Sequence, residues 1–283
     1  MGIKTGIQWT DHTFNPWWIC APISPGCAHC YAEVLARRFG YGWGEGVPRR
    51  VFGDNHWQEP LKWNQKAELE RHRARVFCAS MADVFDPDGP PYERARLWPL
   101  IKHTPWLDWQ ILTKRPENIA SMLPEDWEEG YPNVWLGTTV ESQRYIGRVG
   151  VLTAIPAAIH FVSYEPGLSL ISLGNRRVDW LIVGGESGPN ARPFEPAWAR
   201  QVIAECRRNG VAVFVKQMGS VWARQVGGRH SHGGAPGEWP RDLRIREMPA
   251  PRPTLKNPLE LRLHPLVAGV SVDASQARAS VGS

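Results

Sequence analysis

Three of the five cysteines in this chain lie within eleven residues, in the stretch CAPISPGCAHCYAE. Cys20, Cys27 and Cys30 have the spacing C-x6-C-x2-C. An odd number of cysteines argues against a disulfide framework, and thiols grouped in this way are typical of a metal site. The other two, Cys78 and Cys206, stand alone in apolar segments and are predicted to be buried thiols.

Three explanations of this spacing are open. A structural zinc ion normally takes four protein ligands, so zinc would need His29, His12 or a distant residue as the fourth. The thiols would otherwise be buried or incidental, or they would bind an iron–sulfur cluster. Four-iron clusters usually take four thiolates, so three leave one iron open to a substrate or cofactor. An open iron can chelate S-adenosylmethionine (SAM) and reduce it, which begins the radical chemistry of that cofactor.

The fold that must position these cysteines is indicated by short apolar segments, each followed by a stretch with helical spacing. This alternation predicts an α/β fold with a parallel sheet. The number of segments predicts a complete or partial TIM-type (β/α) barrel of about six to seven parallel strands. The predicted strands are residues 7–10, 75–80, 108–113, 133–138, 159–164, 179–185 and 211–216.

Residues 1–249 are predicted to form one barrel domain, with the cysteine loop at residues 20–30. An insertion at residues 40–74 separates the first predicted helix from the second strand, and it is either a lid or a long crossover. Beyond Pro249 the helical and strand periodicity is lost and the chain is rich in Pro, Ser and Ala. Residues 250–283 are therefore predicted to be a disordered tail.

Polar residues follow several of the predicted strands, at the end of a parallel barrel where reactive groups lie. They are either ordinary loop residues or a ring of carboxylates and amines that holds a zwitterionic cofactor and acts as acid and base. A Gly-rich turn at residues 183–193 would let backbone amides approach an anion. The predicted catalytic residues are Lys114, Glu165 and Lys216. The predicted cofactor-binding residues are Asp83, Glu141, Ser163, Gly184, Gly185 and Glu186.

The positive charge of the chain lies in its last third. Residues 192–283 hold fourteen Lys or Arg against seven Asp or Glu, within a net charge of +5 for the whole chain. Such an excess is typical either of contact with nucleic acid or of a solvated surface. The sequence has no apolar run of about eighteen residues and no apolar signal segment at its start, which predicts a cytoplasmic protein that does not contact a membrane.

Residues 7–33, IQWTDHTFNPWWICAPISPGCAHCYAE, resemble the opening of a phage-associated family of unknown function, the three-cysteine-motif proteins, which are regarded as relatives of the radical SAM enzymes. The resemblance spans residues 5–249. It continues through FCASMADVF, LTKRPENI, VWLGTTVESQ, FVSYEP, WLIVGGESGPNARP, VFVKQMG and EWPRDLRIREMP. Many short segments match in the right order, so the set of motifs is specific.

The resemblance implies a partial TIM-type barrel, a [4Fe-4S] cluster held by Cys20, Cys27 and Cys30, and SAM as cosubstrate, whose cleavage yields a 5′-deoxyadenosyl radical. It also implies an electron donor such as flavodoxin or ferredoxin and a site of action in the host cytoplasm. Phage association, the basic last third and the many Trp residues together suggest a nucleic acid, nucleotide or translation component as substrate, and a partner protein is a further expectation. The alternative is a zinc-stabilised, non-catalytic nucleic-acid-binding module.

Two departures from the pattern bear on the site. Radical SAM enzymes usually have the spacing C-x3-C-x2-C, whereas six residues separate Cys20 from Cys27, so this loop must fold differently. Gly167 stands where the family usually has leucine after Glu-Pro, which alters the shape of the pocket after the fifth strand.

Overall fold

A sheet of seven parallel strands forms the centre of the computed structural model, which describes residues 5–250. The strands lie in the order β1-β4-β5-β6-β7-β8-β9, so each pairs with the strand that follows it in the chain. Their bounds are β1 His12–Phe14, β4 Ala74–Cys78, β5 Leu107–Thr113, β6 Val134–Thr139, β7 Ile159–Tyr164, β8 Trp180–Gly184 and β9 Ala212–Gln217. The predicted tail lies outside the described residues, apart from Ala250.

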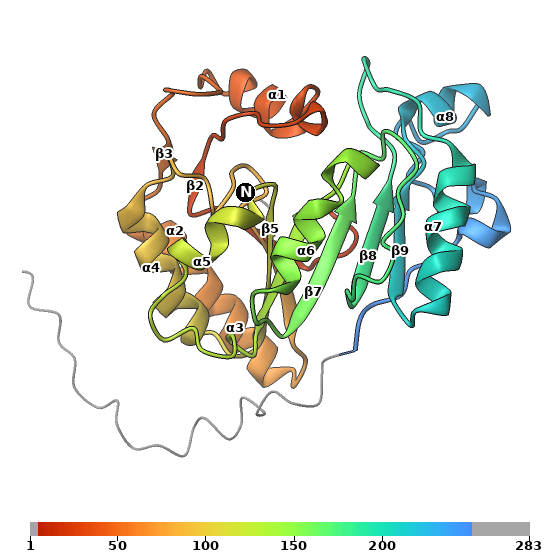
Figure 1. Cartoon of the computed structure of the whole chain (residues 1–283). Coiled ribbons are helices and arrows are strands. Elements are labelled where there is room, and N and C mark those ends of the chain that lie inside the picture. Colours follow the sequence, from red (N-terminus) through yellow and green to blue (C-terminus); the bar gives the residue numbers. More distant parts are fainter. Residues whose placement is uncertain (1–4, 251–283) are drawn as a thin grey trace, which may run out of the picture.

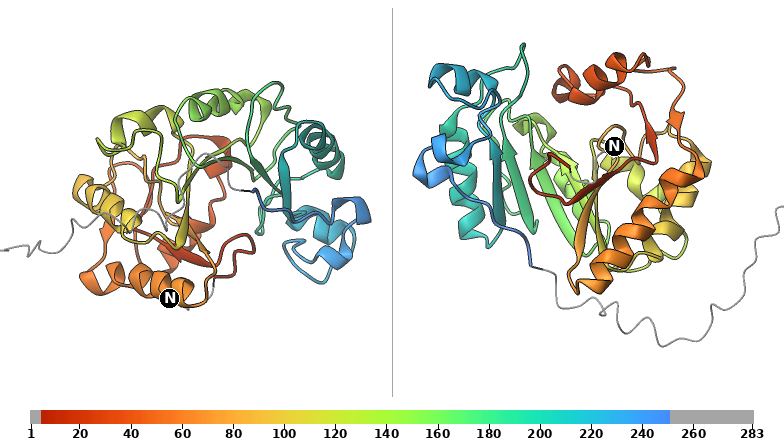
Figure 2. Two further views of the ribbon diagram at one scale, coloured as in Figure 1. Left: turned by 90° about the horizontal axis from the view of Figure 1, so that it is seen from below. Right: turned by 180° about the vertical axis from the view of Figure 1, so that it is seen from behind.

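The sheet is curled but does not close. Its two edge strands, β1 and β9, do not pair with each other, and the sheet has the form of a half-barrel (Figures 1 and 2). The predicted α/β fold and the partial barrel are both confirmed. Because all seven strands are parallel, their carboxyl ends meet at one rim of the half-barrel.

Helices cover the outer face of the sheet (Figure 1). Two clusters of buried apolar side chains, which include Val, Leu, Ile and several aromatic residues, fill the space between these helices and the strands. Cys78 and Cys206 are fully buried in these clusters, as predicted. No helix within residues 5–250 has the length and apolar character that crossing a bilayer requires. The helices are α1 Tyr31–Arg38, α2 Asp54–Trp57, α3 Glu59–Leu69, α4 Pro91–Lys102, α5 Ile119–Met122, α6 Gly147–Thr153, α7 Pro196–Arg208 and α8 Ser220–Gln225.

Aromatic side chains fill the inner, concave face of the sheet. Five of the strands, β4, β6, β7, β8 and β9, contribute one ring each: Phe77, Trp135, Phe161, Trp180 and Phe214, all buried. The segment before β1 lies across this face, with the Trp9 ring 4.6 Å from the Phe77 ring and 5.9 Å from the Trp180 ring, measured between centroids. Many of the Trp residues therefore belong to the core.

The predicted first strand at residues 7–10 is wrong. The first strand is β1, His12–Phe14, which pairs with β4. Residues 7–10 form a turn closed by a hydrogen bond from the Thr10 N–H to the Ile7 carbonyl, 3.4 Å long. The apolar Ile7 and Trp9 were mistaken for one face of a strand, whereas they pack into the concave side of the sheet from outside the hydrogen-bonded ladder.

The insertion at residues 40–74 has two parts. Its second half contains α2 and α3, and Trp57 and Ala67 of these helices pack into the outer core, so this half is a crossover. Its first half ends in β3, Arg50–Val51, which pairs antiparallel with β2, Trp17–Trp18. The Arg50 guanidinium stacks on three rings, those of Trp18, Tyr41 and Phe52, at 4.6–4.9 Å from each ring centroid.

Gly137 of β6 faces the concave side, where the Phe161 ring of β7 lies directly against it. A Cβ atom at this position would lie 2.3 Å from the Phe161 ring, and the surrounding aromatic core leaves that ring little room. We expect Gly137→Ala to lower the free energy of unfolding by about 1–3 kcal/mol, the usual cost of overpacking a core. Urea denaturation measures this change.

Gly150→Ala is the matched control, because a Cβ atom at Gly150 in α6 would meet nothing within 4 Å. Alanine also favours a helix over glycine by about 0.5–1 kcal/mol. The control should therefore be as stable as the parent or slightly more stable. Equal stability of the two variants would contradict the packing described for Phe161.

Candidate functional site

A pocket with a volume of about 370 Å³ opens at the carboxyl-terminal rim of the half-barrel. All three cysteines of the cysteine loop line it, together with residues that follow β4, β5, β7 and β8 and with the last two residues of β9. Of the twelve predicted site residues, ten line this pocket and two, Glu141 and Gly184, do not. The carboxyl ends of parallel strands meet at one rim, and most of the predicted residues accordingly lie together there. This reasoning did not predict which of them contact one another.

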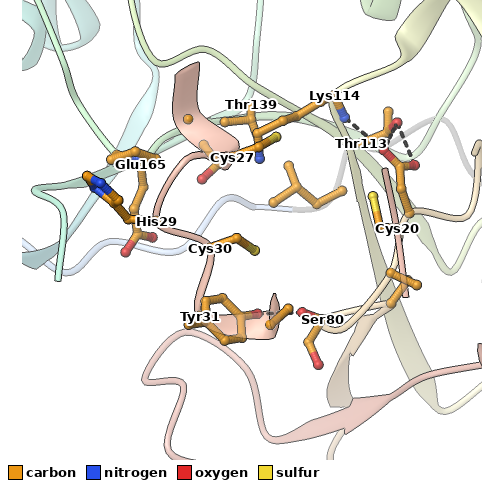
Figure 3. Close-up of a pocket in the computed structure, with 18 of the residues that line it drawn as sticks. Cys20, Cys27, His29, Cys30, Tyr31, Ser80, Thr113, Lys114, Thr139 and Glu165 are labelled. Carbon is orange, nitrogen blue, oxygen red and sulfur yellow. Dashed lines mark hydrogen bonds between the residues drawn. The ribbon is translucent and has the colours of Figure 1, made fainter. Parts of the chain in front are cut away.

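The cysteine loop runs across the mouth of the pocket. Cys20 follows β2, Cys27 ends a short 3-10 helix, Pro25–Cys27, and Cys30 is the N-cap of α1. The three side chains surround one space (Figure 3), and all three thiols are free. The next residue, Tyr31, ties α1 to the segment after β4, because its hydroxyl donates a hydrogen bond of 2.6 Å to the Ser80 carbonyl.

The arrangement of the cysteines does not form a site for a single ion. Within residues 5–250, no group of three or more His, Cys, Asp or Glu side chains is placed to hold one metal ion. His29 Nδ1 lies 3.0 Å from a Glu186 oxygen, and the His12 ring stacks on Trp63 at 4.4 Å between centroids. Neither histidine completes a tetrahedral zinc site with the three thiols.

Three carboxylates at three strand ends, each paired with an arginine, hold the cysteine loop at successive points, either directly or through that arginine. The first is Asp83, after β4, which lies 3.3 Å from Arg115 Nη1. Arg115 donates to Cys20 Sγ at 3.6 Å and to the Ala21 carbonyl at 2.8 Å. Thr113 and the Lys114 N–H also donate to Asp83, at 2.8 and 3.1 Å. Asp83 thus holds the start of the loop through Arg115.

The second contact is made by Glu141, after β6. This carboxylate is completely buried and pairs with Arg148 at 3.0 Å. It accepts a hydrogen bond of 3.4 Å from the Gly26 N–H, and a Cβ atom on Gly26 would lie only 3.3 Å from the carboxylate. Glycine at this position therefore allows the turn before Cys27 to approach the sheet closely.

The third contact is made by Glu186, after β8. Arg192 donates to it from the backbone at 2.8 Å and from Nε at 2.9 Å, and its Nη2 also donates to the Pro25 carbonyl at 2.9 Å. His29 also contacts this carboxylate, so the loop is linked to Glu186 twice, directly by His29 and through Arg192 at Pro25. Burial would raise the pKa of Glu186, but the hydrogen bonds from Arg192 and His29 hold it below its ordinary value.

The cysteines differ in how readily they ionise. Burial, together with the nearby Asp83 charge, raises the pKa of Cys20 to about 12 despite the opposing effect of Arg115. Burial acts in the same direction on Cys27, but the Lys114 charge and hydrogen bonds from residues 23 and 24 bring its pKa below the ordinary value. Without a bound metal, Cys20 keeps its proton at neutral pH and Cys27 is the more acidic thiol.

Glu165 and Lys216 form an ion pair of 2.6 Å inside the pocket, between the ends of β7 and β9. Gly184 of β8 lies behind this pair, and a Cβ atom there would come within 3.2 Å of the Glu165 side chain. Gly185 is similarly constrained, because a Cβ atom would lie 2.5 Å from the Met218 carbonyl. The two glycines therefore make room for neighbouring groups at the pocket wall.

The arginines that pair with the three carboxylates are the functional residues missed from the sequence. Arg115 follows the predicted Lys114 directly, whereas Arg148 and Arg192 lie seven and six residues from the carboxylates that they contact. Neither Glu141 and Arg148 nor Glu186 and Arg192 lie within one helix or strand, so helical or strand periodicity does not predict these contacts. The aromatic floor of the pocket, Trp9 and Phe77, was also missed, because both look like ordinary core residues.

The fold and site define the chain as an α/β half-barrel protein with a three-cysteine loop across the strand ends. It belongs to the family described as "Protein of unknown function (DUF5131)", which matches residues 4–258. No curated protein matches the chain.

The chain is also similar in fold to solved structures of spore photoproduct lyase. A variant of that protein with bound AdoMet and dinucleoside spore photoproduct gives a TM-score of 0.45 at 11% identity, over 74% of this chain and 64% of that one. A second variant gives a TM-score of 0.46 at the same identity and coverage. The chain therefore spans less than two thirds of the length of these proteins.

Proposed function

We propose that this chain is a radical SAM enzyme in which Cys20, Cys27 and Cys30 hold a [4Fe-4S] cluster. The observation that carries this proposal is that three free thiols surround one pocket without a fourth protein ligand among residues 5–250. When bound, such a cluster supplies an electron that cleaves SAM and yields a 5′-deoxyadenosyl radical, which abstracts hydrogen from the substrate.

The donor set fits a cluster better than a single ion. Ligands of one zinc ion all lie at about 2.0–2.3 Å from it and are therefore close to one another. Within residues 5–250, no group of three or more His, Cys, Asp or Glu side chains is placed in this way. Thiolates that bind separate irons of a larger group lie further apart. Thiolates are also soft ligands, and soft ligands bind iron–sulfur clusters in preference to hard cations. The sequence resemblance to relatives of radical SAM enzymes supports the same assignment.

The other pocket residues have separate roles in the proposed reaction. Glu165 and Lys216 form a charged pair that can hold polar groups of the cosubstrate or substrate and exchange a proton with them. Ser163 and Gly185 line the same wall and offer hydroxyl and backbone groups to the cosubstrate. We predicted that Asp83, Glu141 and Glu186 bind the cofactor. All three are already paired with arginines, and they hold the cysteine loop either directly or, for Asp83, through Arg115, so we assign them to shaping that loop.

The partners are proposals of the same kind. The cluster needs an external one-electron donor such as flavodoxin or ferredoxin. We propose a nucleic acid, nucleotide or translation component as substrate, on the basis of the basic last third of the chain. Phage association, implied by the sequence resemblance, would make the host cytoplasm the place of action.

Metal analysis tests the proposal. Protein purified and reconstituted without oxygen should hold about four irons and four sulfides per chain. Its reduced cluster should give an electron paramagnetic resonance (EPR) signal that changes when SAM is added. Cys27→Ser should lose the cluster, because one of only three protein ligands is removed. Cys206→Ala should keep it, because Cys206 is buried in the outer core. Stoichiometric zinc without sulfide would contradict the proposal and favour the zinc-stabilised binding module.

A further inference from the structure

The charged groups that line the pocket are almost completely paired. Asp83 pairs with Arg115, Glu165 with Lys216, and Glu186 with Arg192, which lies beside the pocket. Lys114 is different: among residues 5–250 it has no carboxylate within ion-pair distance, although it lines the same pocket. Among the described residues that line the pocket, its ammonium group is therefore the positive charge that has no carboxylate partner.

Lys114 is held so that its side chain points along the pocket wall. Its backbone N–H donates to Asp83 at 3.1 Å, and the preceding Thr113 hydroxyl donates to the same carboxylate, so the end of β5 is fixed. From there the side chain runs toward Cys27 (Figure 3). The positive charge of Lys114 also contributes to the lowered pKa of Cys27.

A different positive group lies near each of the three cysteines. Cys20 receives a hydrogen bond from Arg115, whose charge is shared with Asp83 and Asp86. Cys30 is the N-cap of α1, where the helix dipole favours negative charge. Cys27 has Lys114. Three thiolates gathered in a partly buried pocket repel one another, and a nearby cation is the simplest way to reduce that cost.

We propose that Lys114 offsets the negative charge of the cluster held by the three cysteines and thereby raises the reduction potential of that cluster. This inference rests on the proposed function. Reduction adds one electron from the external donor to the cluster and makes it more negative, so a fixed positive charge nearby stabilises the reduced form more than the oxidised form. Lys114 acts on the cluster as a positioned charge and needs no contact with the substrate.

The test is a potentiometric titration of the reconstituted protein without SAM, followed by the EPR signal of the reduced cluster. Lys114→Met keeps the length of the side chain and removes its charge, whereas Lys114→Arg keeps the charge. We expect Lys114→Met to lower the equilibrium constant for reduction about tenfold, which corresponds to about 59 mV for a one-electron couple. Lys114→Arg should stay close to the parent, as should Lys62→Met, which removes an exposed lysine of α3.

The outcomes separate this inference from the proposed function. A parent protein without a cluster overturns both. A Lys114→Met protein with a full cluster and an unchanged potential overturns the role of Lys114 alone. If that variant also binds SAM more weakly, Lys114 recognises the carboxylate of the cosubstrate. A Lys114→Arg protein that behaves like Lys114→Met would equally overturn charge compensation, because the charge would then be present without its effect.

Discussion

Replacing Arg115 with methionine should lower the free energy of unfolding by about 3–5 kcal/mol, the usual cost of removing one partner from a buried ion pair. Arg115 is only 5% exposed, and its partners Asp83 and Asp86 are 4% and 1% exposed. The substitution leaves both carboxylates without this guanidinium, and the start of the cysteine loop loses the hydrogen bonds to Cys20 and Ala21. Urea denaturation followed by circular dichroism measures the change.

Arg200→Met is the control for Arg115. Arg200 pairs with Asp242 at the protein surface, with both side chains about half exposed, so its loss should leave the denaturation midpoint nearly unchanged. If the Arg115 variant unfolded at the same urea concentration as this control, Arg115 would not be compensating the charges of the buried carboxylates.

The second large effect concerns the contact between the cysteine loop and Glu186. Arg192→Met removes the link from Glu186 to the Pro25 carbonyl and leaves His29 as the remaining partner from the loop. Groups that orient metal ligands from outside the metal typically contribute about 10–100-fold to metal affinity. If the chain holds the proposed cluster, we expect the reconstituted variant to lose iron to a chelator about 10–100 times more readily than the parent, as measured by the iron that remains bound.

Two further variants make this result specific. Glu186→Gln should weaken iron retention similarly, and the double variant should be little worse than either single one, because the two residues act through one contact. Arg208→Met, at the exposed end of α7, should retain iron like the parent. Additive losses in the double variant would show that Glu186 and Arg192 act separately, against the geometry described here.

The fold was largely predictable because its strands are continuous apolar runs. Six of the seven strands overlap the predicted segments, since a strand buried on both faces has few polar residues. The seventh was misplaced because Trp9 is as apolar as a strand residue but packs on the sheet from outside it. An apolar pattern predicts that a residue is buried, but it does not predict which part of the protein covers that residue.

The candidate site was predictable only up to its location. The carboxyl ends of parallel strands meet at one rim, so residues after different strands were expected to be neighbours, and Glu165 and Lys216 indeed pair. The roles of Glu141 and Glu186 could not be predicted in this way. Their pairing with Arg148 and Arg192 depends on the path of the loops after β6 and β8, which the sequence pattern does not specify.

The three contacts of the cysteine loop have a consequence for the chemistry of the sulfurs. Cys20 is positioned from the ends of β4 and β5, whereas the turn before Cys27 is positioned from β6 and β8. The separation of the sulfurs is therefore determined by the curvature of the sheet as well as by the loop. The aromatic side chains of the concave face, among them Trp135 and Phe161, pack together across the strands of this curved sheet. If the three cysteines hold the proposed cluster, the aromatic interior of the half-barrel helps to set the distances between its sulfur ligands, although none of these aromatic side chains can bind metal.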